Sequence, residues 1–202
     1  MLLLGLGLYA LSSEAASKTL ESDTGINKLL QATDPIPQFL QTFLNIINIA
    51  GKSHYPGSPF IIKQLLRPND THNMDAYNAI KVLLPFKENR GLIFLDPPFK
   101  VKNEFQKLLE ALKKIKLRVL NNTVLIWYPI KDLSLVRDFY HNYKNIGFKE
   151  TMIIEYELLN SDKNMVKCGL MLINPPNIRG ELEKLTEYLS GTLNLKFTYI
   201  YL

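Results

Sequence analysis

Four consecutive residues, Asp96-Pro97-Pro98-Phe99, bring a carboxylate, main-chain carbonyls and an aromatic ring into one short turn. The two prolines fix φ and remove amide donors, so their carbonyls face outward from a rigid segment. A carboxylate and a fixed carbonyl together accept both hydrogens of an exocyclic amino group, and an aromatic ring suits the planar base that carries it. The turn therefore predicts a site for an amino-bearing base, although Asp-Pro-Pro also occurs as an ordinary loop signal.

The segment that must position Asp96 is the apolar run before it, from Gly91 to Leu95. An apolar run without polar alternation is typical of a strand buried on both faces, as in a parallel α/β sheet. Ligands of such sheets bind beyond the carboxyl ends of the strands. We therefore expect Asp96 to lie at the ligand-binding edge of a central strand.

The rest of the chain alternates between helical and strand patterns. Asp34 and Ser58 are expected to cap helices that have a proline in the first turn, and Gly191 is expected to end the last helix. Strand–helix alternation with closing strands predicts an α/β sheet with an antiparallel edge. Helices are predicted over 34–50, 58–67, 74–84, 101–115, 133–146 and 179–190, and strands over 123–127, 152–159, 168–173 and 193–201.

The composition indicates one soluble globular domain, with 202 residues of which 47% are hydrophobic and 21% charged. A net charge of +5 and a pI near 9.1 favour a polyanionic partner, although proteins without nucleic acid partners also have such surfaces. Five lysines lie off the apolar face of the 101–115 pattern and are interpreted as a solvated face in preference to an RNA contact: Lys102, Lys107, Lys113, Lys114 and Lys116. The single cysteine, Cys168, forms no internal disulfide, so we expect a buried thiol and a reducing cytoplasm.

The apolar N-terminus, residues 1–11, has no basic start typical of a signal peptide and is too short to cross a membrane. It is interpreted as a truncated first strand that runs into a glycine loop. Gly5 and Gly7 form Gly-x-Gly, a weak pattern for a nucleotide-binding loop. Ser58 starts a helix whose free amides suit a ligand, the alternative being a purely structural cap.

Five motifs occur in the order and approximate spacing of one family. They are Tyr55-Pro56-Gly57-Ser58-Pro59, Asp75-Ala76-Tyr77, Arg90-Gly91-Leu92-Ile93 leading into Asp96-Pro97-Pro98-Phe99, Ile126-Trp127-Tyr128-Pro129, and Ile173-Asn174-Pro175-Pro176. The chain resembles, over nearly all of residues 4–192, the ribosomal RNA large subunit methyltransferase J family. That family methylates N6 of one adenine of 23S rRNA, adenine 2030, using S-adenosylmethionine. The resemblance implies a Rossmann-like class I S-adenosylmethionine-dependent methyltransferase fold.

The resemblance also implies roles for individual residues. Asp96 matches the catalytic aspartate, Pro97, Pro98 and Phe99 match the adenine contacts, and Ser58, Asp75, Ala76, Gly5 and Gly7 match cofactor contacts. By accepting both amino hydrogens, Asp96 and the Pro97 carbonyl would make the adenine nitrogen a better nucleophile. Asn174-Pro175-Pro176-Asn177 is a competing candidate, because an amide also accepts hydrogen bonds. It lacks an aromatic and is interpreted as a structural turn.

Two segments of the family pattern have no counterpart in this chain. One is a strand and helix with cofactor-contacting histidines before the glycine loop, and the other is a strand and helix between Arg67 and Asn73. We therefore expect an incomplete sheet, with the first strand truncated and the second missing, and a small helical insertion. Residues 1–52 are expected to hold the remnant of the glycine-rich loop and this insertion. Residues 53–202 are expected to form the catalytic core of the same structural domain.

Three functions follow as hypotheses. The first is an S-adenosylmethionine-dependent N6-methyltransferase of 23S rRNA, acting on protein-free rRNA or an early assembly intermediate. The second is an inactive truncated remnant with residual RNA binding, and the third is a DNA adenine-N6 methyltransferase that shares the Asp96 tetrapeptide. We expect a cytoplasmic monomer without a metal ion or a membrane partner.

Overall fold

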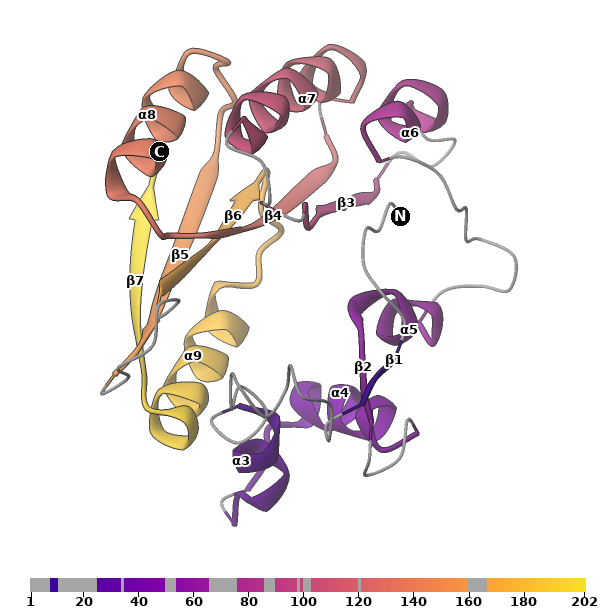
Figure 1. Cartoon of the computed structure of the whole chain (residues 1–202), viewed down its shortest axis with the longest axis vertical. Coiled ribbons are helices and arrows are strands. Elements are labelled where there is room, and N and C mark those ends of the chain that lie inside the picture. Colours follow the sequence, from indigo (N-terminus) through magenta and orange to yellow (C-terminus); the bar gives the residue numbers. More distant parts are fainter. Residues whose placement is uncertain are drawn as a thin grey trace. The chain divides into compact units, whose positions relative to one another are not determined.

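The computed structural model describes residues 8–10, 25–33, 35–49, 54–65, 76–85, 90–97, 99, 103–119, 121–159 and 167–202 (Figure 1). The chain divides into two compact units. The sheet unit comprises Met1–Leu4, His72–Asn177 and Phe197–Leu202, and the helical unit comprises Gly5–Thr71 and Ile178–Lys196. Each unit is described separately below.

The sheet unit is built on five strands in the order β3-β4-β6-β5-β7. The strands are β3 (Leu92–Leu95), β4 (Thr123–Pro129), β5 (Thr151–Leu158), β6 (Lys167–Ile173) and β7 (Leu195–Tyr201). β3 and β4 are parallel, whereas β6 is antiparallel to both β4 and β5. The expected α/β sheet with antiparallel closing strands is therefore confirmed.

Three helices belong to this unit: α6 (Ala76–Leu83), α7 (Glu104–Arg118) and α8 (Leu133–Lys144). The apolar stripe of α7 includes Leu108, Leu112 and Ile115, which are all buried against the strands. Such a stripe recurs every three to four residues, so it forms one face of a helix. Burial of each of these side chains contributes about 1.5–3 kcal/mol. The core of the unit lies on the sheet face that carries Ile93, Leu95, Val124, Ile126 and Met171.

Basic side chains near the end of α7 tie it to the other two helices. Lys116 Nζ donates to the Gly147 carbonyl at 2.7 Å and also to the Ile146 carbonyl, just beyond the end of α8. Arg118 donates to the carbonyls of Lys81 and Leu84, the latter at 3.2 Å, at the end of α6. Carbonyls at a helix end have no partner within the helix, so these cations supply one. Lys116 is thus a structural contact rather than part of a solvated face.

A close approach of backbone and ring fixes the pairing of β4 with β6. Tyr128 lies opposite Gly169, where an added Cβ would come within 2.2 Å of the tyrosine ring. The Tyr128 hydroxyl lies 2.5 Å from that of Tyr140, which donates to Glu155 at 2.9 Å, and Lys167 pairs with Glu155 at 2.7 Å. Glycine at this position therefore allows a buried polar network to connect α8 with the sheet.

Strand β3 differs from its sequence-based expectation in one respect. Ile93 and Leu95 are buried, but Leu92 is 43% exposed, so the prediction of burial on both faces is wrong. Among the described strands, β3 pairs with β4 and stands first in the order β3-β4-β6-β5-β7. Its expected central position in the sheet stays a prediction.

The helical unit contains α3 (Ile26–Gln31), α4 (Gln38–Ile49), α5 (Ser58–Lys63) and α9 (Arg179–Leu193), with a two-stranded antiparallel sheet of β1 (Leu8–Ala10) and β2 (His54–Pro56). Leu29, Leu40, Leu44 and Leu193 form its small core. β1 follows the two glycines and was not predicted as a separate strand. Residues 1–7, where we expected the start of the truncated strand and the Gly5–Gly7 loop, lie outside the described residues.

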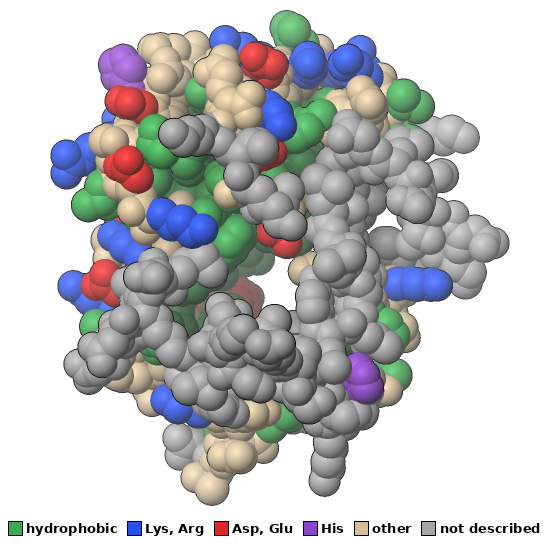
Figure 2. Space-filling model, viewed as in Figure 1, with side chains coloured by type: hydrophobic (Ala, Val, Ile, Leu, Met, Phe, Trp, Pro, Cys, Tyr) green, Lys and Arg blue, Asp and Glu red, His purple; other side chains and the backbone are tan. Residues whose placement is uncertain are grey.

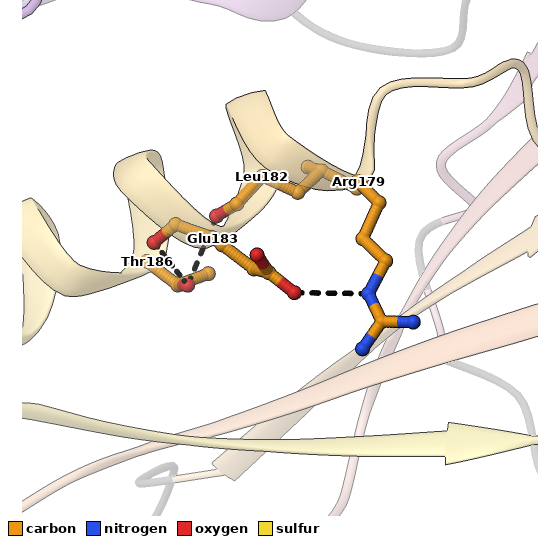
Figure 3. A network of polar contacts seen from close by, with 4 residues as sticks. All are labelled: Arg179, Leu182, Glu183 and Thr186. Carbon is orange, nitrogen blue, oxygen red and sulfur yellow. Dashed lines mark hydrogen bonds and ion pairs between the residues drawn. The ribbon is translucent and has the colours of Figure 1, made fainter.

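Helix boundaries in this unit depart from the predicted caps. α4 begins at Gln38 instead of following Asp34, and the Pro37 carbonyl accepts the first helical hydrogen bonds, because a residue before proline avoids helical angles. α9 continues through Gly191 and ends at Asn194, whose φ of 56° is left-handed. Figure 3 shows the start of α9, where Arg179 pairs with Glu183 at 2.9 Å and Thr186 donates to backbone carbonyls one turn earlier.

Candidate active site at the end of strand β3

Asp96 directly follows β3, at the carboxyl end of this strand, and the parallel neighbour β4 continues three residues beyond the last paired position. Leu95 pairs with Ile126, so the next positions along the two strands are Asp96 and Trp127. Side chains alternate along a strand, and both of these residues therefore belong to the face opposite the α7 core. Asp96 is half-buried, and this burial raises the pKa of its carboxyl above its ordinary value. The carboxylate has no hydrogen-bond or ion-pair partner among the described residues.

The described residues of the segment that follows Asp96, which we call the aromatic turn, are Pro97 and Phe99. Pro97 is buried, and Phe99 is half-buried with a φ of 43°, in the left-handed region. An aromatic residue rarely adopts this conformation, which costs about 1–3 kcal/mol and persists where surrounding contacts hold it. The Phe99 ring lies 5.1 Å from the ring of Phe105 on α7 and 6.2 Å from that of Trp127 on β4. Pro98 lies outside the described residues.

The ring of Trp127 is fixed by a hydrogen bond across the sheet. Its Nε1–H donates to the Tyr156 hydroxyl at 3.1 Å. The pKa of Tyr156 is raised, first by burial and then by Cys168, with a smaller contribution from the charge of Asp96. Cys168, buried as predicted, lies on the same sheet face between β4 and β5. Asp96, Phe99, Trp127 and Tyr156 therefore form one local group of side chains.

Sequence reasoning singled out Asp96 and Phe99 for the site, but it included Trp127 only within a family motif and missed Tyr156. The position of Trp127 could have been inferred, because it occupies the place in β4 that corresponds to Asp96 after β3. Tyr156 lies 29 residues further along the chain on β5. It has no local sequence signal, because its proximity depends on the pairing of β5 with β6.

The competing candidate, Asn174, lies at the other end of β4. β6 runs antiparallel to β4, and Ile173 pairs with Val124 near the start of that strand. The Asn174 side chain donates to the Asn122 carbonyl at 3.1 Å, and the main-chain carbonyl of Asn174 accepts from Thr123 Oγ1 at 2.9 Å. These contacts are those of a structural turn, as its sequence predicted.

Of the residues expected to contact the cofactor, two belong to described segments. Ser58 is the first residue of α5 in the helical unit and is half-buried. The N-cap is Gly57, whose carbonyl accepts from Phe60 and Ile61, so the prediction of Ser58 as the cap is wrong by one residue. Ala76 begins α6 in the sheet unit. Gly5, Gly7 and Asp75 lie outside the described residues.

The described surface carries both signs of charge. On the face shown in Figure 2, Lys and Arg side chains are interspersed with Asp and Glu instead of forming one basic patch. Among the described residues, there is no group of three or more His, Cys, Asp or Glu side chains able to hold a metal ion. No helix in the described part of the chain is long and apolar enough to span a membrane.

A family model for "Ribosomal RNA large subunit methyltransferase D, RlmJ" matches residues 3–74 and 71–198. The chain belongs to this family. The ribosomal RNA large subunit methyltransferase J of Haemophilus influenzae is 28% identical over 223 residues, covering 94% of this chain and 79% of that protein. The methyltransferase J of Escherichia coli is 28% identical over 204 residues, covering 85% and 72%.

A solved structure is similar to this chain over nearly its whole length. The crystal structure of protein LPL1258 from Legionella pneumophila has a TM-score of 0.81 and 25% sequence identity, and the match covers 97% of this chain and 85% of that one. The resemblance to the methyltransferase J family inferred from the five motifs is thus confirmed.

The comparisons also bear on the segment we expected to be missing. The family match falls into two parts that meet at residues 71–74, next to the stretch between Arg67 and Asn73 where we expected a segment to be missing. The alignment with the Haemophilus influenzae methyltransferase spans 223 residues, more than the 202 of this chain. That relative therefore carries residues without an equivalent here, which supports the expected internal deletion.

Proposed function

We propose that this protein transfers a methyl group from S-adenosylmethionine to N6 of an adenine in 23S rRNA, the family's adenine 2030, with Asp96 as the catalytic residue. Membership in the rRNA methyltransferase family supports the reaction class. The observation that carries the proposal is the Asp96 carboxylate at the carboxyl end of β3, which has no hydrogen-bond or ion-pair partner among the described residues and is followed by Pro97 and an aromatic ring. We also propose that the mixed sheet is an incomplete class I methyltransferase sheet.

The chemical problem at N6 is that the amino lone pair is delocalised into the adenine ring. Two acceptors, the Asp96 carboxylate and the Pro97 carbonyl, would bind the two N–H hydrogens and favour positive charge on nitrogen as the new bond forms. The methylated nitrogen must then lose one proton. Burial raises the pKa of Asp96, which makes this carboxylate a better proton acceptor than an ordinary aspartate.

The base must be held flat against the site while it reacts. A base inside a helix is inaccessible, so enzymes that act on it extrude it and stack it on an aromatic side chain. Phe99 would provide that surface, and the rings of Phe105 and Trp127 fix its orientation. Strain in the Phe99 backbone is consistent with a conformation kept for binding.

The cofactor would supply an electrophilic sulfonium methyl group. Ser58, Asp75, Ala76, Gly5 and Gly7 are the residues that we propose to hold it, on the basis of the family resemblance. Their polar groups and glycines suit a nucleoside with an amino-acid tail, and positioning of the methyl group against N6 accounts for the remaining rate acceleration.

The test is methyl transfer from radiolabelled S-adenosylmethionine to protein-free 23S rRNA. Wild-type protein is expected to label the rRNA, and Asp96→Ala is expected to abolish labelling. Asp138→Asn is the matched control, because it removes an exposed carboxylate on α8 away from the turn. Equal labelling by Asp96→Ala and wild type would refute the role of Asp96.

The residues of the Haemophilus influenzae relative that have no equivalent in this chain favour a second candidate, an inactive remnant that keeps residual RNA binding. Isothermal titration with S-adenosylmethionine separates the two candidates. Micromolar binding together with labelling supports the enzyme, whereas absence of both supports the remnant. Labelling of DNA in preference to rRNA in a competition assay would instead indicate a DNA methyltransferase.

A further inference from the structure

Glu104 is a buried carboxylate that the proposed chemistry does not use. It is the first residue of α7, and its side chain is only 3% exposed. In the sequence it follows the segment that connects the Asp96 turn to α7. Its Oε1 accepts a hydrogen bond of 2.6 Å from the Tyr77 hydroxyl, and its Oε2 lies 3.5 Å from Lys107 Nζ. Tyr77 is the second residue of α6 and follows the proposed cofactor contacts Asp75 and Ala76.

The neighbouring residue on α7 contacts the other side of the proposed site. Phe105 lies 5.1 Å from the Phe99 ring, which would stack on the base. One helical turn therefore directs Glu104 to the start of α6 and Phe105 to the aromatic turn. The geometry connects the segment proposed to hold the cofactor with the segment proposed to hold the adenine.

Stability alone gives little reason for a carboxylate at this position. A charge removed from water loses its hydration, and apolar side chains of similar volume often pack at least as stably. The start of a helix favours an acidic residue through its dipole, but that effect needs neither burial nor a tyrosine partner. A short hydrogen bond to a charged acceptor does fix one relative position of two elements.

We infer that Tyr77 and Glu104 are positioning residues that hold the Asp96–Phe99 turn in register with the start of α6. This inference rests on the proposed methyl transfer for its functional meaning. An in-line reaction depends on placement, and a displacement of about 1 Å lowers a rate roughly 100-fold. Loss of the hydrogen bond should therefore reduce kcat through misalignment while Asp96 itself stays intact.

The experiment is a double-mutant cycle on kcat for rRNA methylation with Tyr77→Phe, Glu104→Ala and the double variant. Each single variant should lower kcat by about 10- to 100-fold, and the double variant should be no slower than the slower single. Glu104→Gln keeps an oxygen that accepts from Tyr77 and should retain kcat within about threefold. Independent, multiplicative losses in the double variant would overturn the inference.

Tyr143→Phe is the matched control, because it deletes a tyrosine hydroxyl that hydrogen-bonds Thr151 in the buried core. It should lower the melting temperature with no change in kcat. Hydrogen–deuterium exchange gives a readout that needs no activity: Tyr77→Phe should speed exchange in peptides from β3 to the first turn of α7, and Tyr143→Phe should not. Equal exchange in the two variants would refute the positioning role.

The two proposals fail in distinguishable ways. Wild-type protein that neither binds S-adenosylmethionine nor labels rRNA would refute the methyltransferase function, and exchange would still decide whether Tyr77 holds the turn. An active wild type whose kcat is unchanged by Tyr77→Phe would refute the inference alone.

Discussion

Two turns of this protein have nearly the same composition but opposite use of their polar groups. Asp96-Pro97-Pro98-Phe99 follows β3, and Asn174-Pro175-Pro176-Asn177 follows β6 at the other end of β4. The side-chain amide and the main-chain carbonyl of Asn174 are both engaged by neighbours, whereas the Asp96 carboxylate has no partner among the described residues. Within the described part of the chain, this unpaired carboxylate distinguishes the candidate site from the structural turn.

The backbones of the two turns support the same distinction. Phe99 and Asn174 have φ angles of 43° and 49°, both left-handed. Asparagine tolerates this region, because its short polar side chain bonds locally, but an aromatic residue does not. The fold therefore accepts strain at the Asp96 turn and avoids it at the Asn174 turn.

The largest expected effect is on Asp96. Asp96→Asn keeps the shape of the side chain but removes the proton acceptor and one acceptor position, so kcat for rRNA methylation should fall by about 10²–10⁴-fold. Single-turnover assays with labelled S-adenosylmethionine measure this. Asn174→Asp, by comparison, should leave kcat unchanged. Comparable losses in the two variants would remove the distinction between the turns.

Phe99 should give the next largest effect. Stacking of a base on an aromatic ring is worth about 1–3 kcal/mol, so Phe99→Ala should weaken rRNA binding by about 5- to 150-fold in filter-binding titrations. Phe99→Gly removes the same ring and also removes the strain of a side-chain-bearing residue at a left-handed φ. The unfolding free energy of the glycine variant should exceed that of the alanine variant by about 1 kcal/mol. Equal stability of the two variants would argue against strain at this residue.

Asn174→Ala tests whether the Asn174 turn contributes to stability and not to activity. It removes the hydrogen bond to the Asn122 carbonyl and places alanine at a left-handed φ, so urea unfolding should show a loss of about 1–3 kcal/mol. The rate of methylation under conditions where the protein stays folded should not change. A selective loss of activity without a loss of stability would contradict the structural assignment.

The smallest expected effect is on the pH dependence of the unfolding free energy. The folded Asp96 has a pKa above its ordinary value of 3.8, so the folded state binds the proton more tightly than the unfolded state does. Stability contributed by this group is therefore highest at low pH and decreases as the pH rises through the raised pKa. Asp96→Asn lacks this decrease. The stability of the variant relative to wild type should grow from pH 3 to 7 in urea titrations, and a constant difference would contradict a raised pKa.

Local patterns predicted the elements of the fold well. The stripe containing Leu108, Leu112 and Ile115 indicated α7, because helical periodicity depends only on residues three or four positions apart in the sequence. The predicted helix boundaries were less accurate where two nearby residues could each serve as the helix cap. Gly57 caps α5 instead of Ser58, and Asn194 ends α9 instead of Gly191.

The candidate site was predictable only in its local part. Asp96 and Phe99 form one turn, and their sequence already carried the chemistry. Trp127 with Tyr156, and Tyr77 with Glu104, are separated by 29 and 27 residues along the chain. Their contacts depend on strand order and helix packing, which no short motif encodes. The predicted roles of Ser58 and Ala76, and the division of the chain at residue 52, stay predictions.

The bonds at the two ends of α7 have a mechanical consequence. Tyr77 joins the first turns of α6 and α7, while Arg118 joins the last turn of α7 to carbonyls at the end of α6. Two helices joined by hydrogen bonds at both ends resist sliding past one another, because sliding would break one of these bonds. A displacement of the start of α6 would therefore move α7 with it, and with α7 the aromatic turn that precedes this helix.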